Sequence, residues 1–467
     1  MDHAAPPTPP ANAYTTARLL LSSFLGTILL GAVLLHLPAS HQNESVAIAW
    51  IDALFTATSA VCVTGLSVVD TGTTFSATGQ GILVVLIQVG GLGILTFSTF
   101  FITRLRNRRS GVEISQRLLV ETAHGQLARI PPHRLLGIIL VFTLVAELLG
   151  TLVLWQRFAQ EFPGAEALWM AVFHAVSAFC NAGFSLLGDN LMRYRNDWGV
   201  NGAIMSLIVL GGLGFVVVAE LPGHLKTRLA GTPRRLSLHS RLVLRTSLLL
   251  ILLGCGTILL AEWHNPRAMG ATAEAKILES LFLSVSSRTA GFNTVAMDQL
   301  TNTTLLLVIV LMFIGGSPGS TAGGIKTTTL AVCHALLRSR ARNRPKVECL
   351  ERSLSDETVS RAVWIVTGYL LVTACGFLAL QLSEGGGRTF QETTGNPFLA
   401  YLFETVSALG TVGLSTGLTP ALSATGKGVL IALMFIGRLG PLLVATVLLG
   451  ETRQVRYSYP EEPVNLG

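Results

Sequence analysis

Four segments of the chain carry a similar glycine motif whose backbone could hold an ion. Glycine adopts backbone angles that side chains forbid, so each motif can aim successive carbonyl oxygens at one axis. Four such loops around an axis can replace the hydration shell of a monovalent cation, and their neutral lining predicts a weakly held ion. The motifs are Cys62-Val63-Thr64-Gly65-Leu66-Ser67, Cys180-Asn181-Ala182-Gly183-Phe184-Ser185, Arg288-Thr289-Ala290-Gly291-Phe292-Asn293 and Gly410-Thr411-Val412-Gly413-Leu414-Ser415, with serines shortly before the glycines at Ser59, Ser177, Ser286 and Ser407.

A second glycine motif follows each of these segments. Glycines in membrane helices commonly serve close packing, which is the expectation for the motifs other than the third. The third runs on to Gly324 and contains Pro318, a composition that breaks a helix and predicts a flexible segment below the four loops. In the fourth, Arg438 stands where the others have glycine; a charge there usually faces a water-filled path, with an ion pair or bonds to freed carbonyls as alternatives. The motifs are Gly90-Gly91-Leu92-Gly93, Gly211-Gly212-Leu213-Gly214, Gly315-Gly316-Ser317-Pro318-Gly319 and Gly437-Arg438-Leu439-Gly440-Pro441.

The elements that must position these residues are apolar helices. Half of the 467 residues are hydrophobic, 13% are charged and the mean hydropathy is +0.58, whereas a typical soluble domain has ~25% charged residues. The composition excludes a soluble, disordered or collagen-like chain and predicts an integral membrane protein. Eight stretches are long enough to span a bilayer, at 17–37, 81–102, 135–156, 200–220, 241–262, 304–333, 359–382 and 428–450. Four shorter runs predict re-entrant helices, at 50–63, 167–181, 276–289 and 397–411.

The pattern therefore predicts four copies of one structural unit. The expected fold class is an all-α integral membrane protein with eight transmembrane helices and four re-entrant pore helices around one pseudo-fourfold ion pathway. Non-helical backbone at membrane depth is tolerated where it is buried in protein or lines such a pathway. The expected parts are a disordered cytoplasmic tail (1–16), repeat 1 (17–102), repeat 2 (135–221), repeat 3 with a broken second helix and gate loop (241–334), repeat 4 (358–450) and a cytoplasmic tail (451–467).

Lysines and arginines concentrate in the loops after the second, fourth and sixth expected spans. Cytoplasmic loops of cell-membrane proteins carry such an excess, so both termini are expected in the cytoplasm. This placement explains the net charge of +7 without nucleic acid, and it makes these loops candidate docking surfaces for membrane lipids or an acidic partner. The residues are Arg104, Arg106, Arg108, Arg109, Arg117, Arg129, Arg134, Lys226, Arg228, Arg234, Arg235, Arg338, Arg340, Arg342, Arg344, Lys346 and Arg352.

Other titratable residues are weaker candidates. Glu147, inside an apolar stretch, is either a packing residue or the proton relay of a coupled carrier. Asp52, Glu279 and Glu404 could attract cations or bond loop amides, and His174 is expected to be structural. No enzymatic constellation and no structural metal are expected. Free thiols are expected at Cys62, Cys180, Cys255, Cys333, Cys349 and Cys375.

The loop motifs, the segment 315–326 and Arg438 resemble the Trk/Ktr/HKT superfamily of potassium transporters across residues 17–450. With eight expected spans and short tails, the chain is most similar to the bacterial KtrB membrane subunit. The resemblance implies potassium uptake by a homodimer that docks an octameric, KtrA-like ring of nucleotide-binding regulatory subunits. It implies K+ as the transported ion and no cofactor in this chain, and leaves open an activation by Na+. Members with serine at the first filter position tend toward sodium. This chain has Gly65 at that position. A sodium-permeable channel of the same fold and a proton-coupled carrier remain alternatives.

The resemblance also implies residue roles. In this family the broken helix of the third repeat forms an intramembrane gate loop under the selectivity filter, and the arginine of the fourth repeat narrows the same constriction. The filter, the one expected metal site, would hold K+ with Val63, Thr64, Gly65, Leu66, Asn181, Ala182, Gly183, Phe184, Thr289, Ala290, Gly291, Phe292, Thr411, Val412, Gly413 and Leu414. The gate would consist of Gly315, Gly316, Ser317, Pro318, Gly319, Ser320, Thr321, Ala322, Gly323, Gly324, Ile325, Lys326 and Arg438. Arg288, beside the third filter segment, has no assigned role.

Overall fold

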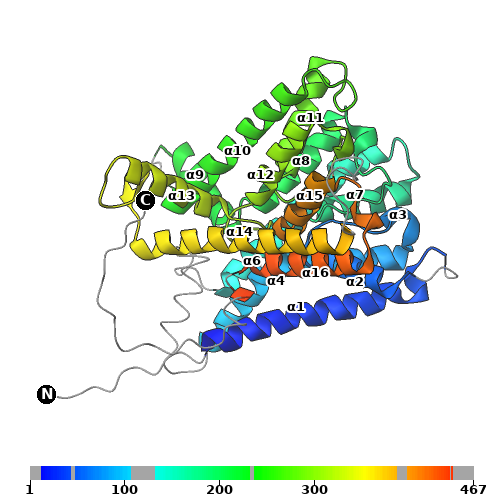
Figure 1. Ribbon diagram of the computed structural model, residues 1–467, viewed down its shortest axis with the longest axis horizontal. Coiled ribbons are helices and arrows are strands. Elements are labelled where there is room, and N and C mark those ends of the chain that lie inside the picture. The colour runs from blue at the N-terminus through cyan, green and yellow to red at the C-terminus, as the bar shows by residue number, and fades with distance from the viewer. Residues whose placement is uncertain are drawn as a thin grey trace.

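The described residues form a bundle of helices and a small hairpin (Figure 1). The computed structural model describes residues 12–43, 48–106, 132–231, 236–385, 397–441 and 443–444. Most of the two expected tails and six of the basic loop residues, Arg108, Arg109, Arg117, Arg129, Arg234 and Arg235, lie outside the described residues.

The helices follow the fourfold pattern. The first long helices are α1 (Asn12–His36), α6 (Pro132–Phe158), α10 (Leu238–Glu262) and α14 (Asp356–Glu384). The short helices are α2 (Trp50–Val61), α7 (Gly164–Phe179), α11 (Ala273–Ser286) and α15 (Pro397–Gly410). The second elements begin with α4 (Ala77–Arg106), α8 (Trp198–Gly212), α12 (Asn302–Phe313) and α16 (Ala424–Leu439). The short helices agree with the predicted re-entrant runs to within about one turn.

Shorter elements complete the chain. Helices α9 (Phe215–Leu229) and α13 (Thr327–Ala341) continue the second elements of repeats 2 and 3. Strands β1 (Glu348–Cys349) and β2 (Arg352–Ser353) form an antiparallel hairpin. The remaining single turns are η1 (Pro38–Ser40), α3 (Thr71–Thr74), η3 (Met192–Tyr194), η4 (Met297–Gln299) and η6 (Thr419–Ala421).

The four repeats close into a ring, because the second element of each packs on the short helix of the next. Helix α4 contacts α7, α8 contacts α11, α12 contacts α15, and α16 contacts α2. Three of these junctions also carry a polar pair near the start of the second element. The pairs are Gln80 with Trp169 (2.7 Å), Arg195 with Glu279 (2.6 Å) and Lys427 with Asp52 (2.7 Å).

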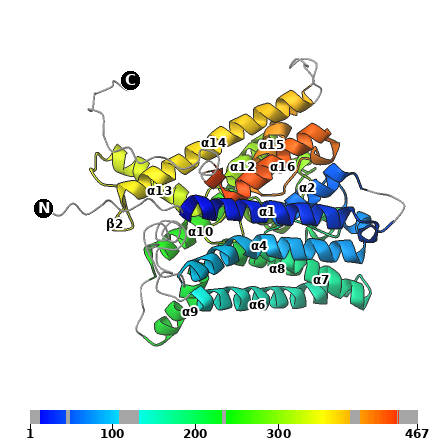
Figure 2. The ribbon, with the colours of Figure 1, turned by 90° about the horizontal axis from the view of Figure 1, so that it is seen from below.

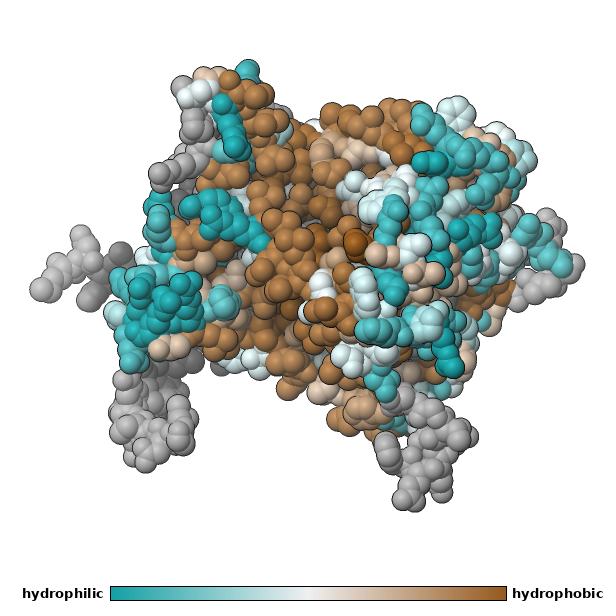
Figure 3. All heavy atoms as spheres, turned by 90° about the horizontal axis from the view of Figure 1, so that it is seen from above, coloured by the Kyte–Doolittle hydropathy of each residue, from teal (hydrophilic) through white to brown (hydrophobic). Residues whose placement is uncertain are grey.

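Apolar residues lie both in the core and on the outer face. Large buried side chains gather on the short helices and their loops, among them Phe55, Phe173, Phe179, Phe184, Phe282, Phe292 and Phe403. Leucines on the outside of the bundle are exposed instead, and Figure 3 shows a hydrophobic band between two hydrophilic ends. Among the described residues α14, α10 and the 137–158 part of α6 are each long and apolar enough to cross a membrane, and α8 with α9 could make a fourth span. These helices make the protein a multi-pass membrane protein; the count of eight spans stays a prediction.

The second glycine motif ends helices more often than the sequence predicted. The stretch 200–220 was expected to be one span, but it breaks between α8 and α9 with a bend of 102°. Gly214 at the break has φ 86° and ψ 143°, and Gly440 at the matching place in repeat 4 has φ 88° and ψ 135°. A side chain is strongly disfavoured in this conformation, so glycine permits both breaks. In repeat 1, α4 continues through the motif as a helix.

Candidate functional site

The four loops after the short helices share one backbone conformation. Two residues before each motif glycine, a residue adopts a left-handed conformation, at Val63, Asn181, Thr289 and Thr411, with φ between 49° and 70°. The motif glycines themselves have φ of 68° to 95°, whereas the residue between has a negative φ. Alternating signs of φ turn successive carbonyl oxygens to the same side of the chain. Left-handed residues other than glycine are strained, so their recurrence in all four loops indicates a constraint common to the site.

The motif glycines meet around one axis. A Cβ atom placed on Gly65 would clash with the carbonyl oxygen of Ala182, and one on Gly183 would clash with that of Ala290. The same holds for Gly291 against Val412 and for Gly413 against Thr64, with separations of 2.8 Å or less. The contacts run from each repeat to the next and return to the first. The structure thus brings the four loops that carry the predicted filter residues together at their motif glycines, with backbone approaching backbone where only glycine fits.

Serines in the last turns of the short helices hold these loops in place. Ser59 Oγ accepts a hydrogen bond from Gly65 N (3.0 Å), and Ser407 Oγ accepts one from Gly413 N (3.1 Å). Ser407 also donates to Leu414 O (2.6 Å), Ser177 donates to Phe184 O (2.8 Å), and Ser286 donates to Phe292 O. The sequence showed these serines as part of the repeat but gave them no role. Their regular distance from the glycines was the available signal.

The segment 315–326 forms a closed loop between α12 and α13. Gly315 N donates to Ile325 O (2.9 Å) and Ile325 N donates to Phe313 O (3.2 Å), so the two ends of the loop pair with each other. A Cβ atom on Gly323 would clash with Oγ1 of Thr411, which places the later part of the loop directly beside the fourth predicted filter segment. Lys326 Nζ donates to Ala322 O (2.7 Å) within the same loop.

Arg438 lies against this loop and is 6% exposed. Its guanidinium donates to the carbonyl oxygens of Thr321 and Gly90, the latter at 2.6 Å. It therefore binds carbonyls, one of the alternatives left open by the sequence, and bridges the loop to α4. Thr321 Oγ1 also accepts a hydrogen bond from Asn181 Nδ2 (3.0 Å). The predicted filter segment at Asn181, the loop and Arg438 therefore form one hydrogen-bonded network.

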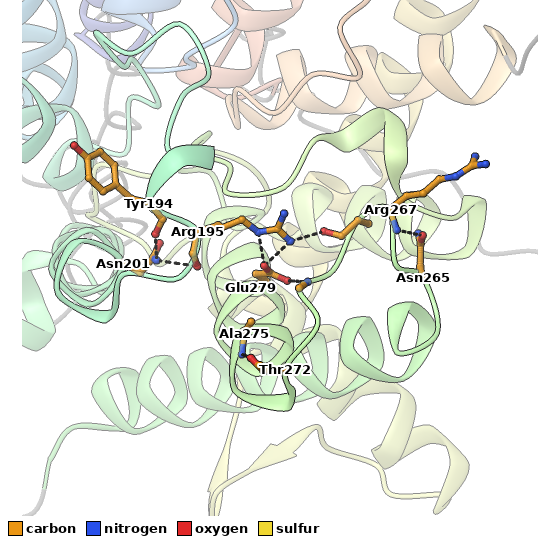
Figure 4. Close-up of polar contacts among 10 residues, drawn as sticks. Tyr194, Arg195, Asn201, Asn265, Arg267, Thr272, Ala275 and Glu279 are labelled. Atoms are coloured by element: carbon orange, nitrogen blue, oxygen red, sulfur yellow. Dashed lines mark hydrogen bonds and ion pairs between the residues drawn. The ribbon is translucent and has the colours of Figure 1, made fainter.

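The remaining candidates bond to groups of the protein itself. Buried Glu404 accepts bonds from Ser415, Thr416 and Thr419 of its own loop. Buried Glu279 accepts one from Gly270 N (2.8 Å) and pairs with Arg195 (Figure 4). Both carboxylates thus bond groups of neighbouring loops, which is one of the two roles predicted for them.

The three other candidates have separate surroundings. His174 is buried and bonds Met170 O and Ser185 Oγ. Glu147 is 8% exposed, and one of its carboxylate oxygens has no hydrogen-bond partner among the described residues. Arg288 reaches Ser247 Oγ (3.3 Å) and Gly315 O (3.5 Å) in a cavity between α8, α10 and the loop. None of these contacts assigns Arg288 a role.

Comparison with known proteins agrees with this arrangement. The sequence profile of the TrkH family, described as cation transport protein, matches residues 21–454. The Ktr system potassium uptake protein B of Bacillus subtilis is 37% identical over 97% of both chains. Its counterpart in Vibrio alginolyticus is 39% identical over 96% of this chain and 94% of its own. The potassium/sodium uptake protein NtpJ of Enterococcus hirae is 35% identical over 96% and 97% of the two chains.

A solved structure has the same fold. The potassium transporter TrkH from Vibrio parahaemolyticus superimposes with a TM-score of 0.69 over 92% of this chain and 85% of its own, at 19% identity. The relatives are transport proteins and not enzymes, which agrees with the expectation from the sequence. The family predicted from the loop motifs is confirmed. The chain belongs to the TrkH family of cation transport proteins.

Proposed function

We propose that the protein takes up potassium across the cell membrane through a selectivity filter of backbone carbonyls. The observation that carries this proposal is the ring of four loops with alternating φ signs, closed by Gly65, Gly183, Gly291 and Gly413. Carbonyl oxygens on the inner side of such a ring replace the hydration shell of a dehydrated monovalent cation. The two relatives named potassium uptake protein B support potassium as the ion.

The finer architecture is part of the same proposal. Eight spans and four re-entrant helices surround one pseudo-fourfold pathway, and both termini face the cytoplasm. Support comes from the regular order of long and short helices and from the exposed cations Lys226, Arg228, Arg340 and Arg342, which lie on α9 and at the end of α13. Both helices lie at one end of the bundle (Figures 1 and 2).

The loop 315–326 and Arg438 limit the flux. The loop lies beside Thr411, and Arg438 ties it to α4. An ion leaving the filter on this side meets the loop first, and a fixed positive charge beside the path adds a barrier for cations. Opening requires the loop to leave Arg438.

Regulation by further subunits is a separate part of the proposal. The relatives' names place them in a Ktr system, which supports a system with more than one component. We propose that the cytoplasmic end docks an octameric ring of nucleotide-binding subunits and that two copies of the chain form a homodimer. Activation by sodium is an open part of this proposal, which sodium titration of potassium uptake would decide.

The experiment is ion flux into proteoliposomes with equal potassium or sodium gradients, for the wild type and for a variant with residues 318–322 deleted. Potassium-selective flux that rises in the deletion variant supports filter and gate. Equal permeability to both ions favours the second candidate, a sodium-permeable channel, which the relative named potassium/sodium uptake protein supports. Loss of uptake in Glu147→Gln with an unchanged filter would favour a proton-coupled carrier.

A further inference from the structure

The break between α8 and α9 is bonded directly to the gate loop. Ser317 N donates to Gly212 O (3.0 Å), Thr321 N donates to Gly211 O (3.2 Å), and Phe215 N donates to Gly319 O (3.0 Å). These backbone bonds fix three successive parts of the loop to the end of one helix and the start of the next. A movement of α9 must therefore strain or release the loop.

Helix α9 is buried at its first turn and exposed beyond it. Phe215, Val216 and Val217 are at most 3% exposed. The helix then leaves the bundle (Figure 2), and Leu221, Leu225 and Leu229 are 43%, 57% and 82% exposed. Residues four apart share one helix face, so the three leucines form a continuous apolar stripe.

Cations flank this stripe on both sides. At 100° per residue, Arg228 lies on one side of the leucines and Lys226 on the other, and both are exposed. Among the described residues no carboxylate lies within ion-pair distance of either cation. The carboxylate of α9 itself, Glu220, accepts bonds from Ser237 N and Ser240 Oγ and so ties α9 to the start of α10.

We propose that α9 lies on the anionic phospholipid surface of the cytoplasmic leaflet and transmits its attachment to the gate loop. An exposed leucine stripe between cations is the pattern of a helix that lies in the membrane interface. The bend of 102° carries α9 across the direction of α8, so α9 runs toward the plane of the membrane where α8 runs along the membrane normal. Attachment stabilises the arrangement seen here, in which the loop lies beside the filter. Anionic lipid therefore lowers flux. The proposal deepens the proposed function and rests on it for the meaning of the gate.

The first test measures the depth of α9 without using transport. A bimane label is placed at Leu225→Cys in full-length protein whose four incompletely buried native cysteines, Cys255, Cys333, Cys349 and Cys375, are serines. In vesicles of phosphatidylcholine and phosphatidylglycerol, brominated acyl chains should quench this label and aqueous iodide should not. The control label at Arg342→Cys, exposed after the end of α13, should show the reverse. Iodide quenching without bromolipid quenching at Leu225→Cys would overturn the proposal and favour an acidic protein partner.

The second test compares flux in vesicles with and without phosphatidylglycerol. Each cation near an anionic surface contributes ~1 kcal/mol, which corresponds to about fivefold. Phosphatidylglycerol should lower wild-type flux, and Lys226→Gln with Arg228→Gln should reverse this by up to about fivefold per cation. The matched control, Arg157→Gln with Arg193→Gln at two half-exposed arginines outside the basic loops, should keep the wild-type lipid response. Flux that is equal in both lipids overturns the coupling. If potassium flux is absent in every lipid, even with residues 318–322 deleted, the proposed function is overturned instead. The bimane label at Leu225→Cys still tests the lipid contact in that case.

Discussion

Replacing Arg438 with methionine should open the pathway. The guanidinium donates to Thr321 O of the gate loop and to Gly90 O of α4, and methionine, which is unbranched and carries no donor, bonds neither. The side chain is 6% exposed, so bulk water does not replace the lost bonds. The loop then keeps its bonds to the α8–α9 break but loses the bond to Arg438, which connects it to α4.

The size of the effect follows from the bond that the loop loses. A hydrogen bond from a charged donor contributes ~1.5–3 kcal/mol, and ~1.4 kcal/mol is tenfold in an equilibrium. Loss of the bond to Thr321 should therefore shift the closed-to-open equilibrium of the loop by about 10- to 100-fold toward open. Removal of a positive charge beside the path acts in the same direction. Flux should rise by at least about tenfold, until the filter itself limits it.

The assay is potassium flux into proteoliposomes, normalised to inserted protein that elutes as one species in detergent. Arg157→Met is the control, because Arg157 is a half-exposed arginine of α6 that pairs loosely with Asp197 (3.9 Å). Its flux should equal that of the wild type. A folded Arg438→Met protein with unchanged or slower flux would refute the assignment of Arg438 to the barrier.

Three further substitutions test the filter and the ring. Gly65→Ser places a side chain at φ 92° against Ala182 O, at a strain of ~1–2 kcal/mol, and should lower the potassium-to-sodium flux ratio by roughly tenfold. Gly428→Ser, where a Cβ meets no atom of the described residues within 4 Å, should leave the ratio unchanged. Ser407→Ala removes two loop bonds worth ~0.5–1.5 kcal/mol each, so both the ratio and the thermal midpoint should fall, and an unchanged ratio would argue against the serine's role. Arg195→Ala leaves buried Glu279 unpaired, which should cost ~3–5 kcal/mol of stability, whereas the same change with Glu279→Gln should recover much of it in a thermal melt.

The repeat, the short helices and the glycine loops could be predicted from the sequence because each depends on local composition. A run of apolar residues too short to span, followed by Thr64-Gly65 or its counterparts, carries its own signal of length and spacing. The left-handed conformation of Asn181 and Thr289 carries no such signal, since neither residue requires it. It results from the closure of the ring.

The contacts between repeats could not be predicted for a similar reason. Arg195 and Glu279 are far apart in the sequence, and their pairing depends on how α8 packs against α11. The break at Gly214 could not be predicted from its motif, because the same motif has two outcomes. In repeat 1 it ends at Gly93, which lies within a continuous helix. The gate-loop bonds to Gly211 and Gly212 stabilise the break, and these bonds appear only in the folded protein.

The most direct test of the account is the flux of the purified chain in proteoliposomes under equal potassium and sodium gradients, with residues 318–322 deleted to remove the barrier. Flux should favour potassium, and Gly65→Ser in the same background should lower that preference. Flux without preference between the ions, or a preference that Gly65→Ser leaves unchanged, would contradict the claim that the ring of four glycine loops selects the ion.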